Sequence, residues 1–159
     1  MERPGAKAAR MTRSYRPARP DDAAALFALR RQSILALAPA GMPVAEAERW
    51  ACGLTPSGMA DKLRDLEVWI ASCDDRLAGW GAIRGDRLEG LYTAPDLAGQ
   101  GVGGGLLAML EGLMQTRGIA MIHAEASGNA EAFYLRRGYR RTGPALVDGA
   151  LPIGKRLLP

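Results

Sequence analysis

A run of glycines is the feature of this sequence whose residue types and spacing most clearly suggest chemistry. Gly101, Gly103, Gly104 and Gly105 follow a predicted strand and open a predicted helix. Glycines remove side chains where the first amides of a helix converge, and the helix dipole adds partial positive charge at that end. Each glycine in a helix costs about 1 kcal/mol relative to alanine, so a tight turn is a weak explanation for four of them. The run therefore predicts a binding site for an anion such as a pyrophosphate.

A dinucleotide-binding turn is one alternative, because residues 99–104 also satisfy GxGxxG and Glu125 follows about 20 residues later. However, the strand before the run is predicted to end near Thr93, whereas a dinucleotide turn follows its strand almost directly. An antiparallel meander precedes the motif, and too few residues follow Gly104 for a doubly wound sheet. The pattern GxxxxGK(S/T) is absent from the sequence, which argues against a nucleotide-hydrolysing P-loop.

The elements that must position the glycine run are predicted from hydrophobic periodicity and turn residues. Three apolar segments broken at Asp74-Asp75 and Gly85-Asp86 are typical of an antiparallel meander. In chain order the expected elements are a short strand (13–20), a helix (22–38), two short helices (44–52 and 56–65), the three strands of the meander (68–73, 76–84 and 87–93), a long helix (102–117) that stops at Gly118, a strand (119–125), a short helix (129–137) and two last strands (139–142 and 151–157).

Length and composition are those of one ordinary globular domain. The chain has 159 residues, of which 48% are hydrophobic and 24% are charged. Residues 1–12 are rich in alanine and arginine and lack hydrophobic periodicity, which predicts a flexible basic tail. We therefore expect a single mixed α/β domain over residues 13–159, with Met11 as an alternative start.

Basic residues concentrate at the beginning of the chain. Six of the 21 Lys and Arg residues lie in residues 1–20 against the single acid Glu2, so the rest is close to neutral although the net charge is +4. A nucleic-acid partner is therefore not expected for the folded body. The sequence contains no apolar stretch typical of a signal peptide or a membrane span, which predicts a cytoplasmic protein. Two cysteines and one histidine, without a CxxC motif, predict neither a disulfide framework nor a metal site.

Two motifs in the expected order resemble those of the GNAT acyl-CoA N-acyltransferases. Residues 98–103, Ala-Gly-Gln-Gly-Val-Gly, are similar to that family's phosphate-binding pattern R/Q-x-x-G-x-G/A, although Ala98 lacks the usual amide or guanidinium. Residues 129–139, Asn-Ala-Glu-Ala-Phe-Tyr-Leu-Arg-Arg-Gly-Tyr, resemble its NxxAxxFYxxxGF helix and following strand. The resemblance covers residues 13 to about 157. It implies a central, mostly antiparallel sheet of about six to seven strands, with a splay between strands four and five, flanked by about four helices.

The resemblance also implies an activity, transfer of the acetyl group of the co-substrate acetyl-CoA to a primary amine, without a metal. Tyr134 matches the family's general acid, and a phenol with a pKa near 10 holds its proton at neutral pH. Glu89, in the fourth strand, is the leading general base, with His123 and Glu125 on one face of the fifth strand as alternatives. The implied contacts to coenzyme A are the pantetheine segment Leu91, Tyr92 and Thr93, at a bulge of the fourth strand, the diphosphate segment Gln100, Gly101, Val102, Gly103, Gly104 and Gly105, and Asn129, Tyr134 and Arg137.

The acceptor is the part of the reaction that the sequence does not name. The resemblance places its site within residues 30–60 and 143–150, and the acceptor can be a small molecule or a peptide amine. Small domains of this family often form homodimers. A non-catalytic module that only binds acyl-CoA is the second hypothesis, and Ala98 favours it. A dinucleotide-binding regulatory domain is the third.

Overall fold

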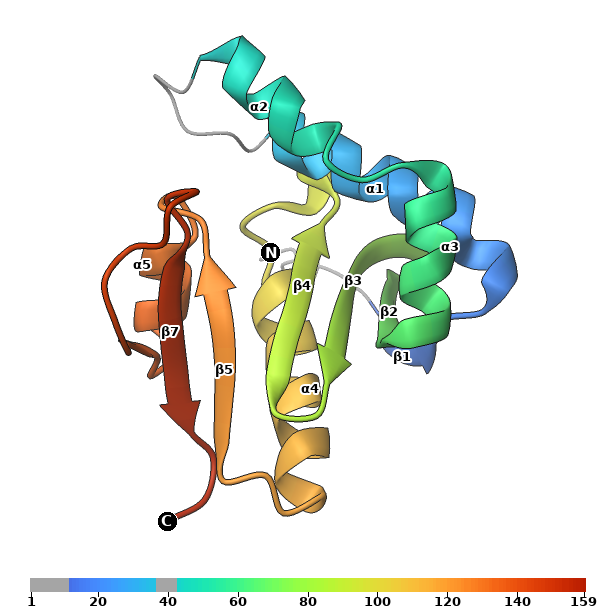
Figure 1. The fold of residues 1–159 in the computed structure, drawn as a ribbon. Coiled ribbons are helices and arrows are strands. Elements are labelled where there is room, and N and C mark those ends of the chain that lie inside the picture. Colours follow the sequence, from blue (N-terminus) through green and yellow to red (C-terminus); the bar gives the residue numbers. More distant parts are fainter. Residues whose placement is uncertain (1–11, 37–42) are drawn as a thin grey trace, which may run out of the picture.

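A seven-stranded sheet forms the centre of the molecule (Figure 1). The computed structural model describes residues 12–36 and 43–159, and of Trp50 the backbone alone. Neighbouring strands follow the order β1-β2-β3-β4-β5-β7-β6. The strands are β1 (Arg13–Pro17), β2 (Glu67–Cys73), β3 (Arg76–Arg84), β4 (Arg87–Thr93), β5 (Met121–Ala126), β6 (Arg140–Arg141) and β7 (Leu151–Arg156). All adjacent pairs are antiparallel except β4 and β5, which confirms the expected mostly antiparallel sheet.

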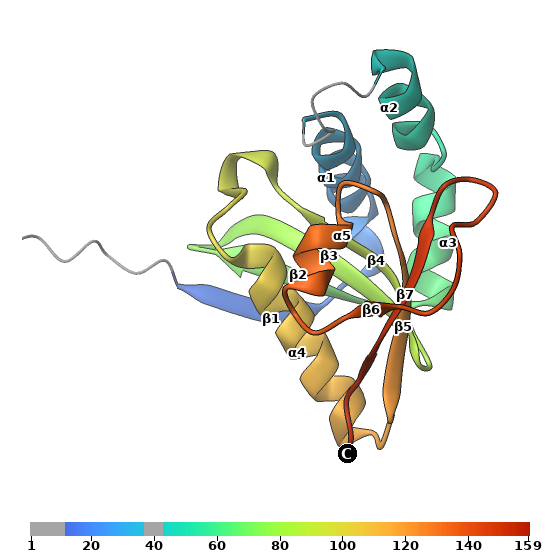
Figure 2. The ribbon, with the colours of Figure 1, turned by 90° about the vertical axis from the view of Figure 1, so that its left-hand side faces the viewer.

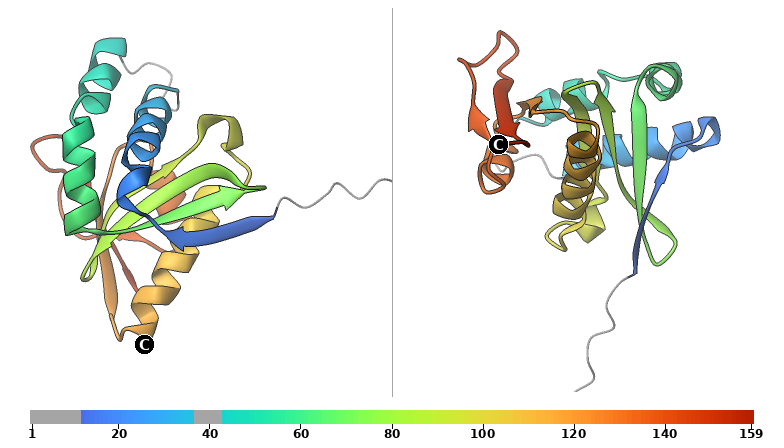
Figure 3. Two further views of the ribbon diagram at one scale, coloured as in Figure 1. Left: turned by 90° about the vertical axis from the view of Figure 1, so that its right-hand side faces the viewer. Right: turned by 90° about the horizontal axis from the view of Figure 1, so that it is seen from below.

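Helices cover both faces of the sheet. Figures 2 and 3 show α1 and α3 on one face and α4 on the other, with α5 on the side of α4. The described residues form five α-helices, each of which the sequence pattern predicted, whereas the family resemblance implied about four. The helices are α1 (Ala23–Ala36), α2 (Val44–Ala51), α3 (Pro56–Asp65), α4 (Val102–Thr116) and α5 (Glu131–Leu135). The expected end of the first helix, at residues 37 and 38, lies outside the described residues.

Turn residues account for the predicted meander. Asp74 and Asp75 have φ values of 49° and 63°, the left-handed conformation that a tight two-residue hairpin requires. Gly85, with φ of 58°, turns β3 into β4. Both hairpins pair antiparallel, so the predicted meander is confirmed.

The splay between β4 and β5 is the feature of the fold that creates a site. The two strands pair at only two positions, Arg87 with His123 and Leu88 with Ala124. Beyond these positions they diverge (Figure 1), while β5 pairs with β7 from Met121 to Ala126. The expected splay is thereby confirmed, and the backbone of β4 after Leu88 has no strand partner on the side of β5.

The core fixes the helices that border this opening. Leu106, Leu107 and Leu110 of α4 are almost fully buried against the sheet, and burial of this kind supplies most of the stability of a helix in a protein. On the other face, the indole N–H of the buried Trp80 donates to the carbonyl of Leu26 in α1 at 3.0 Å. Both walls of the opening are therefore anchored to the same sheet.

Candidate functional site

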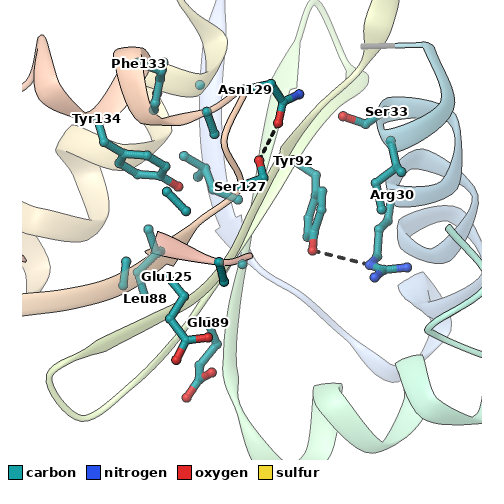
Figure 4. A pocket seen from close by; sticks show the side chains of 18 of the residues that line it. Arg30, Ser33, Leu88, Glu89, Tyr92, Glu125, Ser127, Asn129, Phe133 and Tyr134 are labelled. Carbon is teal, nitrogen blue, oxygen red and sulfur yellow. Dashed lines mark hydrogen bonds between the residues drawn. The ribbon is translucent and has the colours of Figure 1, made fainter. Parts of the chain in front are cut away.

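A cavity of about 650 Å³ opens at the splay (Figure 4). Its lining comes from α1, α2, β4, β5 and α5, together with the start of α4 and the loop before β7. The structure brings together in it many of the residues expected at the site, namely Glu89, Leu91, Tyr92, Thr93, Gly103, Asn129 and Tyr134, and also Glu125. Elements far apart in the sequence thus contribute to one concave surface, as is usual for a ligand site.

A second hollow, of about 440 Å³, lies beside the same helix start. Gly101, Gly104, Gly105 and Arg137 line it, whereas Gly103 lines the first cavity. The beginning of α4 therefore separates two hollows, and its amides lie at their boundary. The side chain of Val102, another expected contact, is 1% exposed and packs in the core, so only its backbone is available.

The amides at the start of α4 lie where the sequence predicts an anion site. Gly101 is the N-cap residue, with φ of +82°, a conformation that glycine adopts without strain. The first bond of the helix runs from the Gly105 amide to the Gly101 carbonyl at 3.0 Å, and the Gln100 amide donates to Leu97 at 3.3 Å. The four amides between them, those of residues 101–104, have no partner inside the helix. Within the expected diphosphate segment, residues 100–105, backbone donors are therefore expected from residues 101–104.

Glycine at these positions also admits neighbouring side chains. A Cβ atom on Gly104 would lie 2.8 Å from the Arg137 guanidinium, and one on Gly105 would lie 2.7 Å from the Tyr15 hydroxyl. Real Cβ atoms do not approach other atoms so closely, so glycine allows Arg137 and Tyr15 to pack against the helix. The same glycines therefore allow close packing of neighbouring side chains and leave the amides at the helix start uncovered.

Arg13 is a contributor that the sequence analysis did not identify as a site residue. Its Nη1 donates to the Gly101 carbonyl at 2.9 Å and its Nη2 to the Gln100 carbonyl at 2.6 Å. The beginning of β1 is held in turn, because the amide of Thr12 and the carboxylate of Asp74 form a 3.0 Å hydrogen bond. Arg13 thus anchors the loop before α4, and its guanidinium adds positive charge close to Gly101 and Gly105, as that of Arg137 does close to Gly104. No local signal could reveal this contact, because 87 residues separate Arg13 from Gln100.

Replacing Arg13 with alanine is expected to raise the Kd for coenzyme A about 10-fold, since one charge-assisted contact and the anchored loop are lost. Calorimetric titration measures this change. Arg16→Ala is the matched control, because Arg16 lies on the same strand and pairs with Asp22 at 2.9 Å instead. A Kd that rises equally in both variants would show that Arg13 contributes only general charge.

The bulge of β4 lies at Glu89. Leu88 and Gly90 pair with consecutive residues of β3, which leaves Glu89 without a partner between them. The expectation that the bulge falls within residues 91–93 was wrong, because these residues pair regularly with residues 79–81. A bulge re-aims the side chain it carries, and here that side chain lines the cavity. Residues 91–93 still present their other backbone edge to the splay, where β5 has diverged.

Two of the three candidate bases share the cavity. Figure 4 shows the carboxylates of Glu89 and Glu125 side by side below Tyr134. Arg87 lies 3.8 Å from Glu89 and 3.4 Å from Glu125, so it bridges the two acids across the splay. His123 is not part of the lining; it pairs with Arg87 at the closed end of the splay, and its Nε2 lies 3.8 Å from Asp86. The geometry therefore favours the glutamates over His123.

Tyr134 presents its phenol to the cavity from α5 (Figure 4). The residue is 8% exposed, and its ring packs edge-on against those of Phe133 and Tyr139, with centroids 5.1 and 5.2 Å away. Burial raises the pKa of the Tyr134 phenol above its usual value, and the nearby Tyr92 adds to this effect. The phenol therefore holds its proton at neutral pH and can donate it.

The other two expected contacts also belong to this region. The Ser127 hydroxyl donates to the amide oxygen of Asn129 at 2.5 Å, in the loop between β5 and α5. Arg137 donates to the Phe133 carbonyl at 2.9 Å, and its guanidinium lies 3.8 Å from the centre of the Phe133 ring. These bonds hold Asn129 beside the first cavity and Arg137 beside the second.

Within residues 12–36 and 43–159, no cluster of three His, Cys, Asp or Glu side chains is arranged to hold a metal ion. None of the described helices has the length and apolar character needed to cross a membrane.

Comparison with known proteins gives a consistent result. A family model described as "Acetyltransferase (GNAT) domain" matches residues 42–153. The peptidyl-lysine N-acetyltransferase YjaB of Salmonella typhimurium is 30% identical over 91 residues, which are 57% of this chain and 61% of that protein. This chain thus matches less than two thirds of that relative's length.

Solved structures share the fold. A GCN5-related N-acetyltransferase from Rhodopseudomonas palustris superposes with a TM-score of 0.78 at 28% identity, covering 91% of this chain and 96% of the other. The PaiA N-acetyltransferase from Thermoplasma acidophilum, solved with coenzyme A, gives a TM-score of 0.73 at 18% identity, with coverage of 92% and 99%. Since the family model spans more than half of the chain, this chain belongs to the GNAT acetyltransferase family.

Proposed function

We propose that this chain transfers the acetyl group of acetyl-CoA to a primary amine. The observation that carries this proposal is the shared cavity, in which the protonated phenol of Tyr134, the carboxylates of Glu89 and Glu125 and the helix start at Gly103 meet at the splay. An acyl transfer to an amine requires these three functions: a proton donor, a proton acceptor and a fixed anchor for the acyl carrier.

Residues at the start of α4 fit the diphosphate of coenzyme A. The four amides of residues 101–104 would donate to it, and the nearby guanidinium groups of Arg13 and Arg137 would offset its charge. Pantetheine carries amide groups, and the open backbone edge of residues 91–93 would bind them. Bound in this way, acetyl-CoA supplies a thioester carbonyl that an amine can attack.

The residues of the cavity would move two protons. Glu89, directly or through a water molecule, would accept a proton from the acceptor's ammonium group, with Glu125 as the alternative base. The neutral nitrogen then forms a bond to the carbonyl carbon while the carbon–sulfur bond breaks. The Tyr134 hydroxyl would donate its proton to the departing thiolate. The new amide nitrogen would then lose a proton, which restores the Tyr134 phenol, and Glu89 would release the proton it accepted to solvent, so that the products are the amide, the thiol and one proton.

Titration and thiol release test the proposal together. We expect calorimetry to detect binding of acetyl-CoA and no binding of NAD, which separates an acyltransferase from a dinucleotide-binding domain. Thiol release should then rise when a suitable amine from a screened set is added. Binding of acetyl-CoA with no amine-dependent release from any acceptor would favour the non-catalytic module, for which the alanine at position 98 is the supporting observation.

A further inference from the structure

The part of the cavity that faces away from the start of α4 carries charges of both signs on separate walls. Arg30 and Arg49 line it from the helices α1 and α2, Glu89 and Glu125 line it from the sheet, and Asp148 lines it from the loop before β7. Figure 4 shows Arg30 and Ser33 on α1, across the cavity from Tyr134, and the two glutamates together on the strands. An acceptor held between these walls meets cations at one end and carboxylates at the other.

Arg30 is held in a defined orientation on its wall. Its Nε donates to the Tyr92 hydroxyl at 3.3 Å, and its Nη1 donates to the Ala51 carbonyl at 3.2 Å. The guanidinium also lies 5.6 Å from the centre of the Tyr92 ring. Ser33, 8% exposed and one helical turn further along α1, adds a hydroxyl to the same wall.

Neighbouring arginines offset the negative charge of the wall that carries Glu89 and Glu125. Glu89 lies 3.4 Å from Arg84 and 3.8 Å from Arg87, and Arg87 also contacts Glu125. Because these side chains offset much of the negative charge, the two glutamates do not make the cavity a site for a polycation. They provide a proton acceptor, whereas the helical wall provides the positive potential.

We infer that the acceptor is a small amine that also carries a carboxylate, a molecule of amino-acid type. Its carboxylate would bind at Arg30 and Arg49, since a guanidinium binds a carboxylate through paired hydrogen bonds, and its amine would lie beside Glu89. The size of the cavity agrees with a small molecule, because about 650 Å³ must hold the end of the thioester arm as well as the acceptor. This inference rests on the proposed function and names the substrate class for the same site.

Matched pairs of acceptors test the inference. The pairs are amino acids with a terminal amine at increasing distance from the carboxylate, each with its carboxamide, and the measurement is amine-dependent thiol release from acetyl-CoA. We expect at least one acid to exceed its amide in kcat/KM by about 10-fold or more, mainly through a lower KM. Equal kcat/KM for every acid and its amide would overturn the inference while leaving the acetyltransferase proposal intact.

Two variants locate the carboxylate site. Two substitutions should each lower, several-fold, the ratio of kcat/KM for the acid to kcat/KM for its amide. They are Arg49→Ala, at an exposed position, and Arg30→Lys, which keeps the charge but loses the paired donors. Arg64→Ala is the control, because Arg64 pairs with Asp61 on α3 and should leave the ratio unchanged. A ratio that stays at the wild-type value in both variants would also overturn the inference. If acetyl-CoA binds and no amine causes release, the proposed function itself fails, a result distinct from equal activity on acid and amide.

Discussion

The substitution Tyr134→Phe is expected to lower kcat by about 100- to 1000-fold, the usual contribution of a positioned general acid. The Kd for acetyl-CoA should stay within about twofold, because the ring and its contacts with Phe133 and Tyr139 are retained. Stopped-flow thiol release and calorimetric titration measure the two quantities. An unchanged kcat would remove Tyr134 from the reaction.

Tyr139→Phe is the matched control for this variant. Tyr139 is also buried, but its hydroxyl donates to Glu111 at 2.8 Å and does not line the cavity. Its loss should reduce the free energy of unfolding by about 1 kcal/mol and leave kcat unaffected. A similar fall in kcat for both variants would point to a structural effect of losing a buried hydroxyl.

The pH profile gives a further check on the same residue. A general acid must be protonated, so activity is lost as the pH rises through its pKa. Burial raises the pKa of the Tyr134 phenol, which moves this loss above the ordinary tyrosine range. The wild-type kcat should therefore show no decline caused by Tyr134 up to about pH 10. A decline near pH 8 that is absent from Tyr134→Phe would contradict this assignment.

The substitution Gly103→Asp is expected to raise the Kd for coenzyme A about 100-fold or more without destabilising the protein. Its carboxylate would occupy the amides at the start of α4 and repel the diphosphate. The same charge favours the helix dipole, and replacing a helical glycine removes a backbone cost. These gains oppose the close approach of the new Cβ atom to the Thr93 hydroxyl, at 3.2 Å, so the unfolding midpoint should change little. A substitution that weakens binding but preserves stability is the result expected if the glycine at this position serves binding rather than folding.

Two controls separate charge from volume in this experiment. Gly103→Ala adds a Cβ atom 3.2 Å from the Thr93 hydroxyl without adding charge, and we expect a smaller loss of affinity. Gly112→Asp adds the same charge further along α4, where a Cβ atom meets no other atom within 4 Å, and the Kd should not change. Equal affinity for Gly103→Asp and the wild type would mean that the diphosphate does not bind at this helix start.

Local patterns predicted the elements of the fold well. The meander and the long helix that stops before Gly118 are confirmed, and so is the splay between the fourth and fifth strands, which the resemblance to the GNAT family implied. Each depends on residues close together in the sequence or on motifs in a known order. The roles assigned to Tyr134 and Glu89 stay predictions until the variants above are measured.

The incorrect or missing predictions concern register between strands and contacts between distant segments. The bulge lies at Glu89, since register with β3 decides which residue of β4 is left without a partner. His123 shares a strand face with Glu125 but lies at the closed end of the splay, where β4 and β5 still pair. Arg13 reaches the loop before α4 because β1 is tied to the turn at Asp74.

By itself, therefore, the sequence determined which segments are strands and helices and where the chain turns, and it predicted an anion site at a glycine run that begins a helix. Periodicity, turn conformation and exposed amides are local properties, so a short stretch of residues encodes them. Only the tertiary structure decided that Arg13 and Arg137 flank that helix start, and that Arg30 lines the same cavity as Glu89. Strand order and register set these distances between segments, and no single segment carries that information.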